Sequence, residues 1–353
     1  MNNKKHVIGL MSGTSLDGVD LVYVVFNSDY NKEAYNYKIR NSETVSYSDN
    51  WLKKLKDAFH YNKEQLLKLN IEYGIYLADL IVEFVQKNKI SKIDFIASHG
   101  HTIHHKPNEG YTLQIGDGKT IAKKTNIKVI CDFRSQDVRL GGQGAPLVPI
   151  GDKLLFSKYD YCLNLGGFAN ISFDDNQKRI AFDICAVNTV LNHYANKLDL
   201  DYDDKGKIAR RGTVIPNLLN ALNKLDFYKD NHPKSLGIEY VHTVLLPLID
   251  TYNLAIADIL HTYIEHIAMQ ITIQIKKKGA VLVTGGGAFN IFLMERIEYH
   301  TTSKIIMPNK NIINYKEALV FAFLGLLRDE KKINCLKSVT GASKDHCSGV
   351  VFE

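Results

Sequence analysis

The sequence is poor in features that mark several whole classes of protein. Its 353 residues include 7 prolines, 1 tryptophan and 5 cysteines, and no two cysteines form a CxxC pair. An odd number of scattered cysteines argues against a disulfide framework and against a structural zinc site. The longest clearly apolar run, Ala318–Leu327, is about half of what a membrane span needs. The apolar stretch Val7–Met11 is too short for a signal peptide, so we expect a cytoplasmic protein without a membrane anchor.

A strong charge of either sign is also missing. Lysine and arginine total 44 against 38 acidic residues, which gives a net charge of +6. The densest cationic run, Lys276–Lys278, closes an apolar helical stretch, where the helix dipole favours cations. We therefore expect no nucleic-acid partner. A hydrophobic content of 45% is ordinary for globular proteins, and the length suggests two domains at about 150 residues each.

Strand-like and helix-like segments alternate along the chain, which predicts α/β architecture. The expected strands are Val7–Leu10, Leu21–Phe26, Phe95–Ser98, Val129–Asp132, Tyr161–Leu165, Ile171–Phe173, Ile180–Ile184, Val281–Thr284 and Lys304–Met307. The expected helices are Trp51–His60, Glu64–Lys87, Asn188–Leu198, Pro216–Tyr228, a long one within His242–Lys278, Asn290–Tyr299 and Lys316–Leu327. In the second helix, apolar residues recur at steps of three and four and predict a core-facing side: Leu66, Leu69, Tyr73, Leu77, Leu80 and Phe84.

One pattern occurs twice. A strand, a glycine-containing turn and a second strand appear at Val7–Phe26 and again at Tyr161–Phe173. Two similar hairpins, each opening an α/β half, predict duplicated domains that face each other across a central cleft. We place one domain at residues 1–157 plus 316–353 and the other at 158–315.

The first segment that can carry chemistry is GLMSGTSLDGVD, from Gly9 to Asp20. Its glycines allow backbone N–H groups to approach an anion, its hydroxyls add donors, and Asp17 and Asp20 can hold a hydrated metal or orient a nucleophile. It lacks the GxxxxGK(S/T) pattern of a Walker A loop. The alternative is a hairpin turn with local hydrogen bonds. We favour phosphate binding because so many glycine, hydroxyl and carboxylate groups occur together.

Two further segments end predicted strands. VLVTGGGAFN, from Val281 to Asn290, exposes glycine backbone at a helix start, although a glycine run can also serve close packing. Asn290 stands where the dinucleotide-binding pattern GxGxxG needs its last glycine, so NAD is disfavoured. IAFDICAVN carries Asp183 to the end of a strand, where α/β sheets bind ligands. On spacing alone, a site carboxylate and an ordinary helix cap are equally good interpretations of Asp183.

Two segments are rich in histidine or arginine. SHGHTIHH, from Ser98 to His105, suggests a metal site, but no carboxylate or thiolate lies beside it, and we consider metal the less favoured interpretation. In CDFRSQDVRLGGQGAPLVP, Arg134 and Arg139 could clamp an anionic group. Arg134 is the better candidate because it lies near a strand end. The alternative is surface salt bridging, which contributes little stability.

Taken together, these segments resemble the anhydro-N-acetylmuramic acid kinase family of the actin, Hsp70 and sugar-kinase superfamily. The matching motifs run in order from Met11 to Gly341: MSGTSLDGVD, SHGHT, QIGDG, DFRSQDVRLGGQGAPLVP, NLGGFANIS, the FD of AFDICAVN, HPKSLG, TGGGAFN and SVTG. The resemblance implies two actin-like, ribonuclease H-like domains. It also implies a kinase that uses ATP and water to convert 1,6-anhydro-N-acetylmuramic acid to N-acetylmuramic acid 6-phosphate, in peptidoglycan recycling.

The resemblance also implies roles for individual residues. Asp183 corresponds to the catalytic base that activates water. Thr102, Arg134 and Glu317 match positions that contact the sugar, and Asp17 would face the Mg²⁺ ion of Mg-ATP. A homodimer is possible. The residues expected to bind ATP form a phosphate-binding turn and an adenosine-side loop: Gly13, Thr14, Ser15, Leu16, Asp17, Gly18, Val19, Asp20, Gly285, Gly286 and Gly287.

The chain departs from the family pattern at two places. The family often has DTGPxN where this chain has DICAVN, from Asp183 to Asn188, so a phosphate approaching this turn would meet Cys185 instead of a glycine. His101 stands where glutamine is frequent. Two alternatives therefore stay open: a sugar kinase or ATPase of the same fold with another substrate, and a nucleotide-dependent interaction protein.

Overall fold

The computed structural model describes residues 3–13, 15–29, 34–230 and 234–353. The chain divides into two compact units, Met1–Leu155 with Tyr315–Glu353, and Phe156–Asn314. We predicted the corresponding boundaries after residues 157 and 315. The second boundary falls inside helix α12 (Lys310–Asp329), where the φ of Tyr315, −117°, departs from helical geometry.

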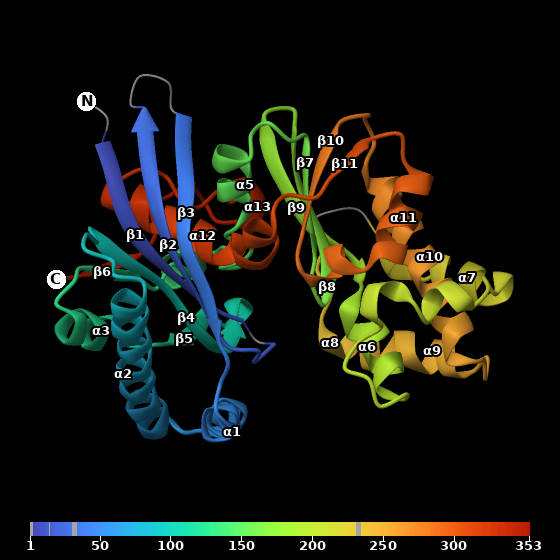
Figure 1. Cartoon of the computed structure of the whole chain (residues 1–353), viewed down its shortest axis with the longest axis horizontal. Helices are drawn as coiled ribbons and strands as arrows, with labels where there is room; N and C mark the ends of the chain where they lie inside the picture. Colours follow the sequence, from blue (N-terminus) through green and yellow to red (C-terminus); the bar gives the residue numbers. More distant parts are fainter. Residues whose placement is uncertain (1–2, 14, 30–33, 231–233) are drawn as a thin grey trace. The chain divides into compact units, whose positions relative to one another are not determined.

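Unit 1 is built on a seven-stranded sheet in the order β12-β6-β4-β1-β2-β3, with β5 paired to β4 (Figure 1). β1, β2 and β3 pair antiparallel, whereas β4 pairs parallel with both β1 and β6. The strands are β1 (Asn3–Ser12), β2 (Val19–Asp29), β3 (Ala34–Val45), β4 (Phe95–Lys106), β5 (Tyr111–Ile115), β6 (Val129–Cys131) and β12 (Val350–Phe352).

Two long helices pack on this sheet. Successive side chains of a strand point to opposite faces, and α2 packs with Ile8 and Leu10 of β1, whereas Gly9 between them touches α12. All six apolar residues predicted to face the core from α2 are buried, which confirms that side of the helix. The helices of unit 1 are α1 (Asp49–Asp57), α2 (Lys63–Lys87), α3 (Gly118–Thr125), α4 (Ser135–Arg139), α5 (Pro149–Leu155), α12 and α13 (Lys337–Thr340), with short turns η1 (Ala58–His60) and η2 (Pro107–Glu109).

Unit 2 is built on a five-stranded sheet in the order β11-β10-β7-β8-β9. Its strands are β7 (Tyr161–Leu165), β8 (Phe168–Asp175), β9 (Lys178–Ala186), β10 (Ala280–Thr284) and β11 (Lys304–Ile306). The helices are α6 (Asn188–Asn196), α7 (Pro216–Asn223), α8 (Ile238–Tyr240), α9 (Leu246–Asp250), α10 (Ile256–Gln274) and α11 (Ile291–His300). Shorter turns are η3 (Asp204–Gly206), η4 (Ala209–Arg211), η5 (Asp226–Tyr228), the π-helical η6 (Val241–Leu245) and η7 (Gly286–Phe289).

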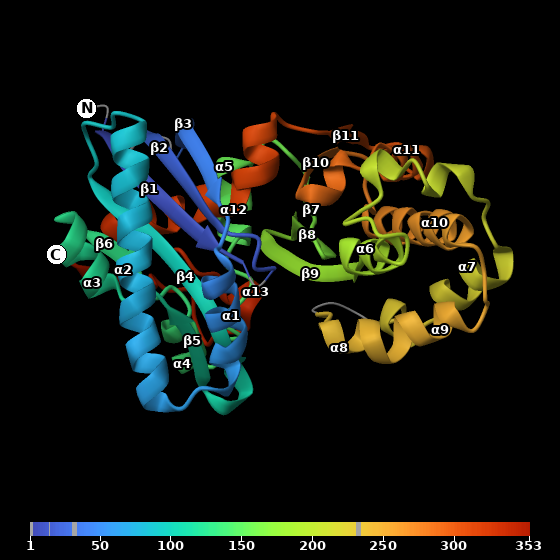
Figure 2. The same ribbon diagram turned by 60° about the horizontal axis from the view of Figure 1, so that its bottom comes forward.

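Helix α10 forms the centre of the unit 2 core. Tyr263, Ile267 and Ile271 are fully buried against apolar residues of β7, β8 and β10. α11 lies beside α10 in both views of the ribbon (Figures 1 and 2). Arg296 of α11 donates two hydrogen bonds, of 2.6 and 2.9 Å, to the Glu265 carboxylate of α10, a bidentate arrangement that fixes the two helices in register.

The two sheets share one topology. In each, the first three strands pair antiparallel in sequence order, and two later strands extend the sheet in parallel from the first strand. This arrangement confirms the duplicated, ribonuclease H-like α/β fold of the actin class. The predicted cleft between the domains stays a prediction.

The structure differs from the sequence analysis at several elements. Strands β3, β5 and β12 were not predicted, because β3 is a mostly polar strand paired only with β2 and the other two are short. The long helix expected within His242–Lys278 is interrupted, and α10 begins only at Ile256. All five cysteines are free thiols, as the spacing predicts. Within the described ranges, no helix has the length and apolar character needed to cross a lipid bilayer.

Candidate functional site

The turn between β1 and β2 has the backbone of a tight, glycine-dependent loop. Gly18 has a φ of +149°, and a Cβ atom there would lie 2.3 Å from the Val45 carbonyl oxygen, so no larger residue fits. The Leu16 amide donates a 3.3 Å hydrogen bond to the Gly13 carbonyl. Ser15 and Asp17 are exposed on this turn. Thr14, which we predicted to bind ATP, lies outside the described residues.

Ser12 does not offer its hydroxyl to a ligand. It is 2% exposed, and its Oγ lies 2.5 Å from the Tyr47 hydroxyl, 2.9 Å from His101 Nδ1 and 3.0 Å from the Tyr73 hydroxyl. We expected the hydroxyls of the Gly9–Asp20 segment to donate to an anion. For Ser12 this is wrong, because its side chain joins a buried polar network beneath the turn. Burial lowers the pKa of His101 to about 4, so its ring is neutral in this network.

Two other carboxylates of unit 1, Glu317 and Asp17, act on Asp20. Asp20 Oδ1 accepts a 2.6 Å hydrogen bond from the Thr44 hydroxyl. Burial, with smaller contributions from Glu317 and Asp17, raises the pKa of Asp20 to about 6, and the Thr44 bond opposes that rise. Glu317 reaches solvent from α12, yet desolvation by the surrounding protein raises its pKa, while Lys316 and Arg134 lower it. The carboxylates form an acidic group whose negative charge favours a cation.

Arg134 is held in place by two acceptors. Its Nε donates a 2.9 Å hydrogen bond to His99 Nε2, and its Nη1 donates a 2.6 Å bond to the Gly144 carbonyl. His99 Nδ1 lies 2.9 Å from the Gly100 carbonyl, which can only accept, so Nδ1 carries the proton and Nε2 is free to accept from Arg134. Burial and Arg134 hold the pKa of His99 well below its ordinary value, which keeps this acceptor neutral. The guanidinium therefore has a fixed orientation.

The remaining residues of the two histidine- and arginine-rich segments have less specific surroundings. Thr102 is half-buried, and its Oγ1 accepts a 3.3 Å hydrogen bond from Gln114 Nε2. Arg139 is exposed at the end of α4. Among the described residues, none of the four histidines of β4 belongs to a set of three closely spaced metal-ligating atoms. The described residues therefore give no support to the less favoured metal interpretation of SHGHTIHH.

The glycine run of unit 2 divides into packed and open positions. Gly285 has a φ of +85°, and a Cβ atom there would lie 2.7 Å from the Leu165 carbonyl oxygen; at Gly287 it would lie 2.8 Å from the Leu165 Cβ. Gly286 is exposed, and the nearest atom to its Cβ position is Asn188 Nδ2, 3.8 Å away. Close packing thus accounts for Gly285 and Gly287, whereas only Gly286 presents bare backbone to a ligand.

Asp183 is oriented by a segment that runs along β9. Its Oδ2 accepts a 3.0 Å hydrogen bond from the Leu236 amide, its backbone amide donates 3.0 Å to the Lys234 carbonyl, and Ser235 bonds its side chain. The residue is half-buried, and burial raises the pKa of its carboxyl, although the bonds from Leu236 and Ser235 oppose the rise. The N-cap of α6 is Val187, without a side-chain cap bond. The structure therefore does not support the helix-cap interpretation of Asp183.

The Cys185 side chain is buried and does not face a ligand. It is 0% exposed and packs in the hydrophobic core of unit 2, and the neighbouring Ala186 carbonyl accepts a 3.0 Å bond from the Tyr263 hydroxyl. β9 continues to Ala186, so Asp183 lies within the strand and not at its last residue. The expectation that a phosphate would meet the Cys185 side chain is wrong, because this side chain points into the core.

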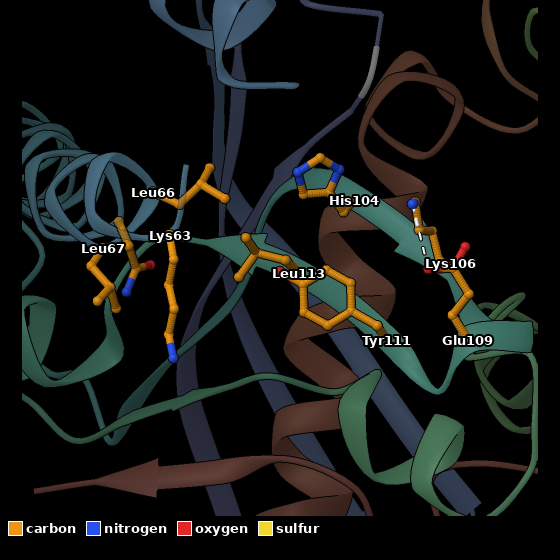
Figure 3. A pocket seen from close by; sticks show the side chains of 9 residues that line it. Lys63, Leu66, Leu67, His104, Lys106, Glu109, Tyr111 and Leu113 are labelled. Atoms are coloured by element: carbon orange, nitrogen blue, oxygen red, sulfur yellow. Dashed lines mark hydrogen bonds and ion pairs between the residues drawn. The ribbon is translucent and has the colours of Figure 1, made fainter. Parts of the chain in front are cut away.

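A separate pocket of about 550 Å³ lies in unit 1 between α2 and the β4–β5 hairpin (Figure 3). Leu66, Leu67, Leu113 and Tyr111 give it an apolar lining, and Lys106 and Glu109 form a 3.4 Å ion pair at its edge. The pocket contains none of the predicted catalytic, ATP-binding or sugar-binding residues.

Comparison with known proteins gives a match along nearly the whole chain. The model of the anhydro-N-acetylmuramic acid kinase family matches residues 5–353. The chain belongs to this family. The anhydro-N-acetylmuramic acid kinase of Shewanella sediminis is 34% identical over 376 residues, covering 99% of both chains. The enzyme of the same name from Shewanella sp. strain MR-4 is 35% identical over 373 residues, also with 99% coverage of each.

Sequence reasoning missed the residues that hold Arg134 and Asp183, the two candidate site residues, in place. His99 and Gly144 fix Arg134, and Ser235 with Leu236 fixes Asp183. Ser235 and Leu236 belong to the motif HPKSLG, which served above only to mark the family resemblance. His232 and Pro233 of that motif lie outside the described residues. A backbone amide donor such as Leu236 leaves no mark in the sequence, because any residue type except proline supplies it.

Proposed function

We propose that this chain opens the 1,6-anhydro ring of 1,6-anhydro-N-acetylmuramic acid with water and phosphorylates O6, using ATP. The observation that best supports the proposal is the half-buried Asp183 carboxylate, oriented by Leu236 and Ser235, in a chain of this kinase family. The products would be N-acetylmuramic acid 6-phosphate and ADP. The reaction would serve peptidoglycan recycling in the cytoplasm, and the location and a homodimeric state remain predictions from the sequence.

In the proposed reaction, Asp183 accepts a proton from a water molecule as that water attacks the anomeric carbon. The bond between the anomeric carbon and O6 breaks, and O6 keeps the electron pair of that bond. O6 is then the nucleophile that attacks the γ-phosphorus of ATP. The bond from the γ-phosphorus to the bridging oxygen then breaks and releases ADP. A general base of this kind must be ionised before the reaction. The two hydrogen bonds to the Asp183 carboxylate favour that ionised form, since both donate to it.

The sugar contacts are assigned to unit 1. Arg134 uses Nε and Nη1 to bind His99 and Gly144, which leaves its second terminal nitrogen to donate to a polar group of the sugar. Burial lowers the pKa of Arg134 to about 10, so the guanidinium remains charged at neutral pH. Glu317 would accept from a sugar hydroxyl, and Thr102 can donate or accept through its hydroxyl.

ATP is assigned to the Gly13–Asp20 turn and to the loop Gly285–Gly287. Mg²⁺ prefers oxygen ligands and commonly takes only one or two carboxylates together with substrate phosphates. The exposed Asp17 and the nearby Asp20 fit that donor set. When bound, the ion would neutralise the phosphate charge. Asp17 would hold the Mg²⁺ ion beside the ATP phosphates.

Gly286→Val tests the nucleotide loop. Because the Cβ position of Gly286 is open, the valine should fit without loss of fold, but it should obstruct the nucleotide. We expect the KM for ATP to rise by about tenfold with kcat little changed, the pattern of lost ground-state binding. Gly285→Ala is the matched variant, and it should lower the melting temperature because its Cβ atom would clash with Leu165. An unchanged KM in a folded Gly286→Val protein would remove this loop from the ATP site.

The pH dependence of kcat/KM tests the ionisation of Asp183. Burial raises the pKa of this carboxyl above the ordinary value of 3.8, so activity should fall as pH falls through a pKa higher than 3.8. Asp20, whose pKa is raised to about 6, is the control. The Asp20→Asn variant should keep the acid limb of the profile. Loss of that limb in Asp20→Asn would transfer the essential ionisation from Asp183 to Asp20.

Product analysis tests the proposed function itself. Protein, Mg-ATP and either 1,6-anhydro-N-acetylmuramic acid, N-acetylmuramic acid, N-acetylglucosamine or glucose are incubated in parallel, and ADP and sugar phosphates are measured by mass spectrometry. We expect phosphorylation of the anhydro sugar in strong preference to the others. Equal or better turnover of another sugar would favour a kinase with a different substrate. Nucleotide binding without phosphorylation of any sugar would favour an interaction protein.

A further inference from the structure

A second cluster of reactive side chains lies in unit 1, apart from every residue assigned above. Asp137 of α4, Cys335 and His346 place one potential ligand atom each within 4.8 Å of the others, and all three residues are buried. Cys335 and His346 face each other across an isolated antiparallel bridge, which directs both toward Asp137. This is the single such group of three among the described residues.

The His346 ring lacks a partner on the side that faces the cluster. Its Nδ1 lies 3.1 Å from the Lys344 carbonyl, which can only accept, so Nδ1 carries a proton. Nε2 is buried without a hydrogen-bond partner and lies 3.5 Å from Asp137 Oδ1. A neutral ring would therefore direct a lone pair at a carboxylate oxygen. Such a contact requires a positive charge between the two atoms, either a proton or a metal ion.

The Asp137 carboxylate is the anionic member of the cluster. It is 0% exposed, and its oxygens accept from the Gly144 amide at 2.7 Å, the Thr340 hydroxyl at 2.7 Å and the Cys335 thiol at 3.0 Å. The Arg134 guanidinium also acts on this carboxylate electrostatically. Burying a carboxylate is costly unless a cation or many hydrogen bonds compensate for it. The cluster thus combines a buried, hydrogen-bonded carboxylate with a thiol and an imidazole nitrogen that has no hydrogen-bond partner.

We propose that Asp137, Cys335 and His346 bind one divalent transition-metal ion of the zinc class. Oxygen, sulfur and nitrogen ligands at about 2.0 to 2.3 Å from a tetrahedral zinc ion lie roughly 3.3 to 3.7 Å apart. His346 Nε2 lies 3.5 Å from Asp137 Oδ1, within that range. Cys335 Sγ lies 3.0 Å from the same oxygen as a hydrogen-bond donor, so this distance must lengthen by about 0.5 Å when an ion replaces the thiol proton. The Thr340 hydroxyl or a water molecule would complete the coordination.

The surroundings of the ligands match a metal site. Histidines that bind metals usually donate their other ring N–H to a backbone carbonyl, as His346 does to Lys344. Asp137 is likewise fixed by Gly144, whose carbonyl holds Arg134. The Cys335 thiol donates its proton to Asp137 when no ion is bound, so ion binding must displace that proton. The ion would tie the C-terminal segment to the loop that supports Arg134.

Metal content is the first test. We expect the purified wild-type chain, or the chain reconstituted with zinc after treatment with a chelator, to hold about one zinc ion, as a closed structural site does. Cys335→Ser and His346→Gln should lose that ion, whereas Cys347→Ser, which removes the adjacent thiol outside the cluster, should keep it. Retention of the ion by both cluster variants, or its loss in Cys347→Ser, would overturn the assignment.

A second test needs no variant to fold. Cobalt(II) added to the metal-free wild-type chain should give the intense absorption of a tetrahedral site and a thiolate-to-metal charge-transfer band, with release of a proton. Zinc should raise the melting temperature of the same sample, and a chelator should reverse the rise. A wild-type chain that shows no cobalt spectrum and no shift with zinc would contradict the proposal. The cluster would then be a hydrogen-bonded pair of Asp137 and protonated His346.

Discussion

Replacing Asp183 by asparagine should lower turnover by roughly a hundredfold to ten-thousandfold, the usual contribution of general-base catalysis. The amide keeps the size of the carboxylate, and its oxygen can still accept the hydrogen bond from the Leu236 amide. It cannot take a proton from water. Nucleotide binding and the melting temperature should therefore change little, and turnover, nucleotide affinity and melting temperature should be measured on one preparation.

Asp183→Ala separates catalysis from positioning. This variant leaves the Leu236 amide without its acceptor, so stability should fall by about 1 kcal/mol, the usual contribution of one such bond. Asp183→Asn should lose as much activity as Asp183→Ala while retaining stability. The opposite pattern, an active Asp183→Asn protein with reduced stability, would make Asp183 a structural residue and would overturn the proposed mechanism.

Arg134→Lys should lower kcat/KM for the sugar on the order of tenfold or more. Lysine keeps the charge but loses the planar fork that donates simultaneously to His99 Nε2, to the Gly144 carbonyl and to a ligand. At least one of the two acceptors, His99 Nε2 or the Gly144 carbonyl, would lose its hydrogen-bond donor. The lysine ammonium would no longer be held in one orientation. Steady-state kinetics with the anhydro sugar, at saturating ATP, measures this loss.

His99 supplies the matched control for Arg134. His99→Gln offers an acceptor oxygen to Arg134 Nε, whereas His99→Phe fills the space beside Phe321, 4.5 Å from the histidine ring, without an acceptor. We expect His99→Gln to stay closer to the wild type in kcat/KM than His99→Phe does. Wild-type kinetics in Arg134→Lys would place Arg134 outside the sugar site.

The fold followed from local signals wherever these were strong. All nine predicted strands overlap observed strands, because buried apolar runs next to turns identify them. β3 was missed although Tyr35, Tyr37 and Ile39 alternate with polar residues, which is the pattern of a strand with one exposed face. The rest of this edge strand, residues 40–45, is mostly polar and obscures that pattern. The interruption before Ile256 was missed because apolar periodicity continues through the π-helical Val241–Leu245 and the turn that follows α9.

The sequence suggested the side chains of the candidate site but not the contacts that orient them. Asp183 lies within a predicted strand and Arg134 lies two residues after one, and their chemical types suggested roles. Their orientation depends on contacts that are distant in sequence, such as Leu236 with Asp183 and His99 with Arg134. Close packing at Gly285 and Gly287 depends on Leu165 in another strand. No local pattern records such contacts, so the sequence could not separate these two glycines from the open Gly286.

Isotope labelling tests the central claim most directly. Protein, Mg-ATP and 1,6-anhydro-N-acetylmuramic acid are mixed in ¹⁸O-water, and the products are analysed by mass spectrometry with fragmentation of the sugar. If Asp183 activates water for attack on the anomeric carbon, one ¹⁸O atom should enter the anomeric hydroxyl of N-acetylmuramic acid 6-phosphate, and none should enter its phosphate. Label found in free phosphate, with the anhydro sugar unchanged, would show that the protein is an ATPase and would contradict the coupled reaction.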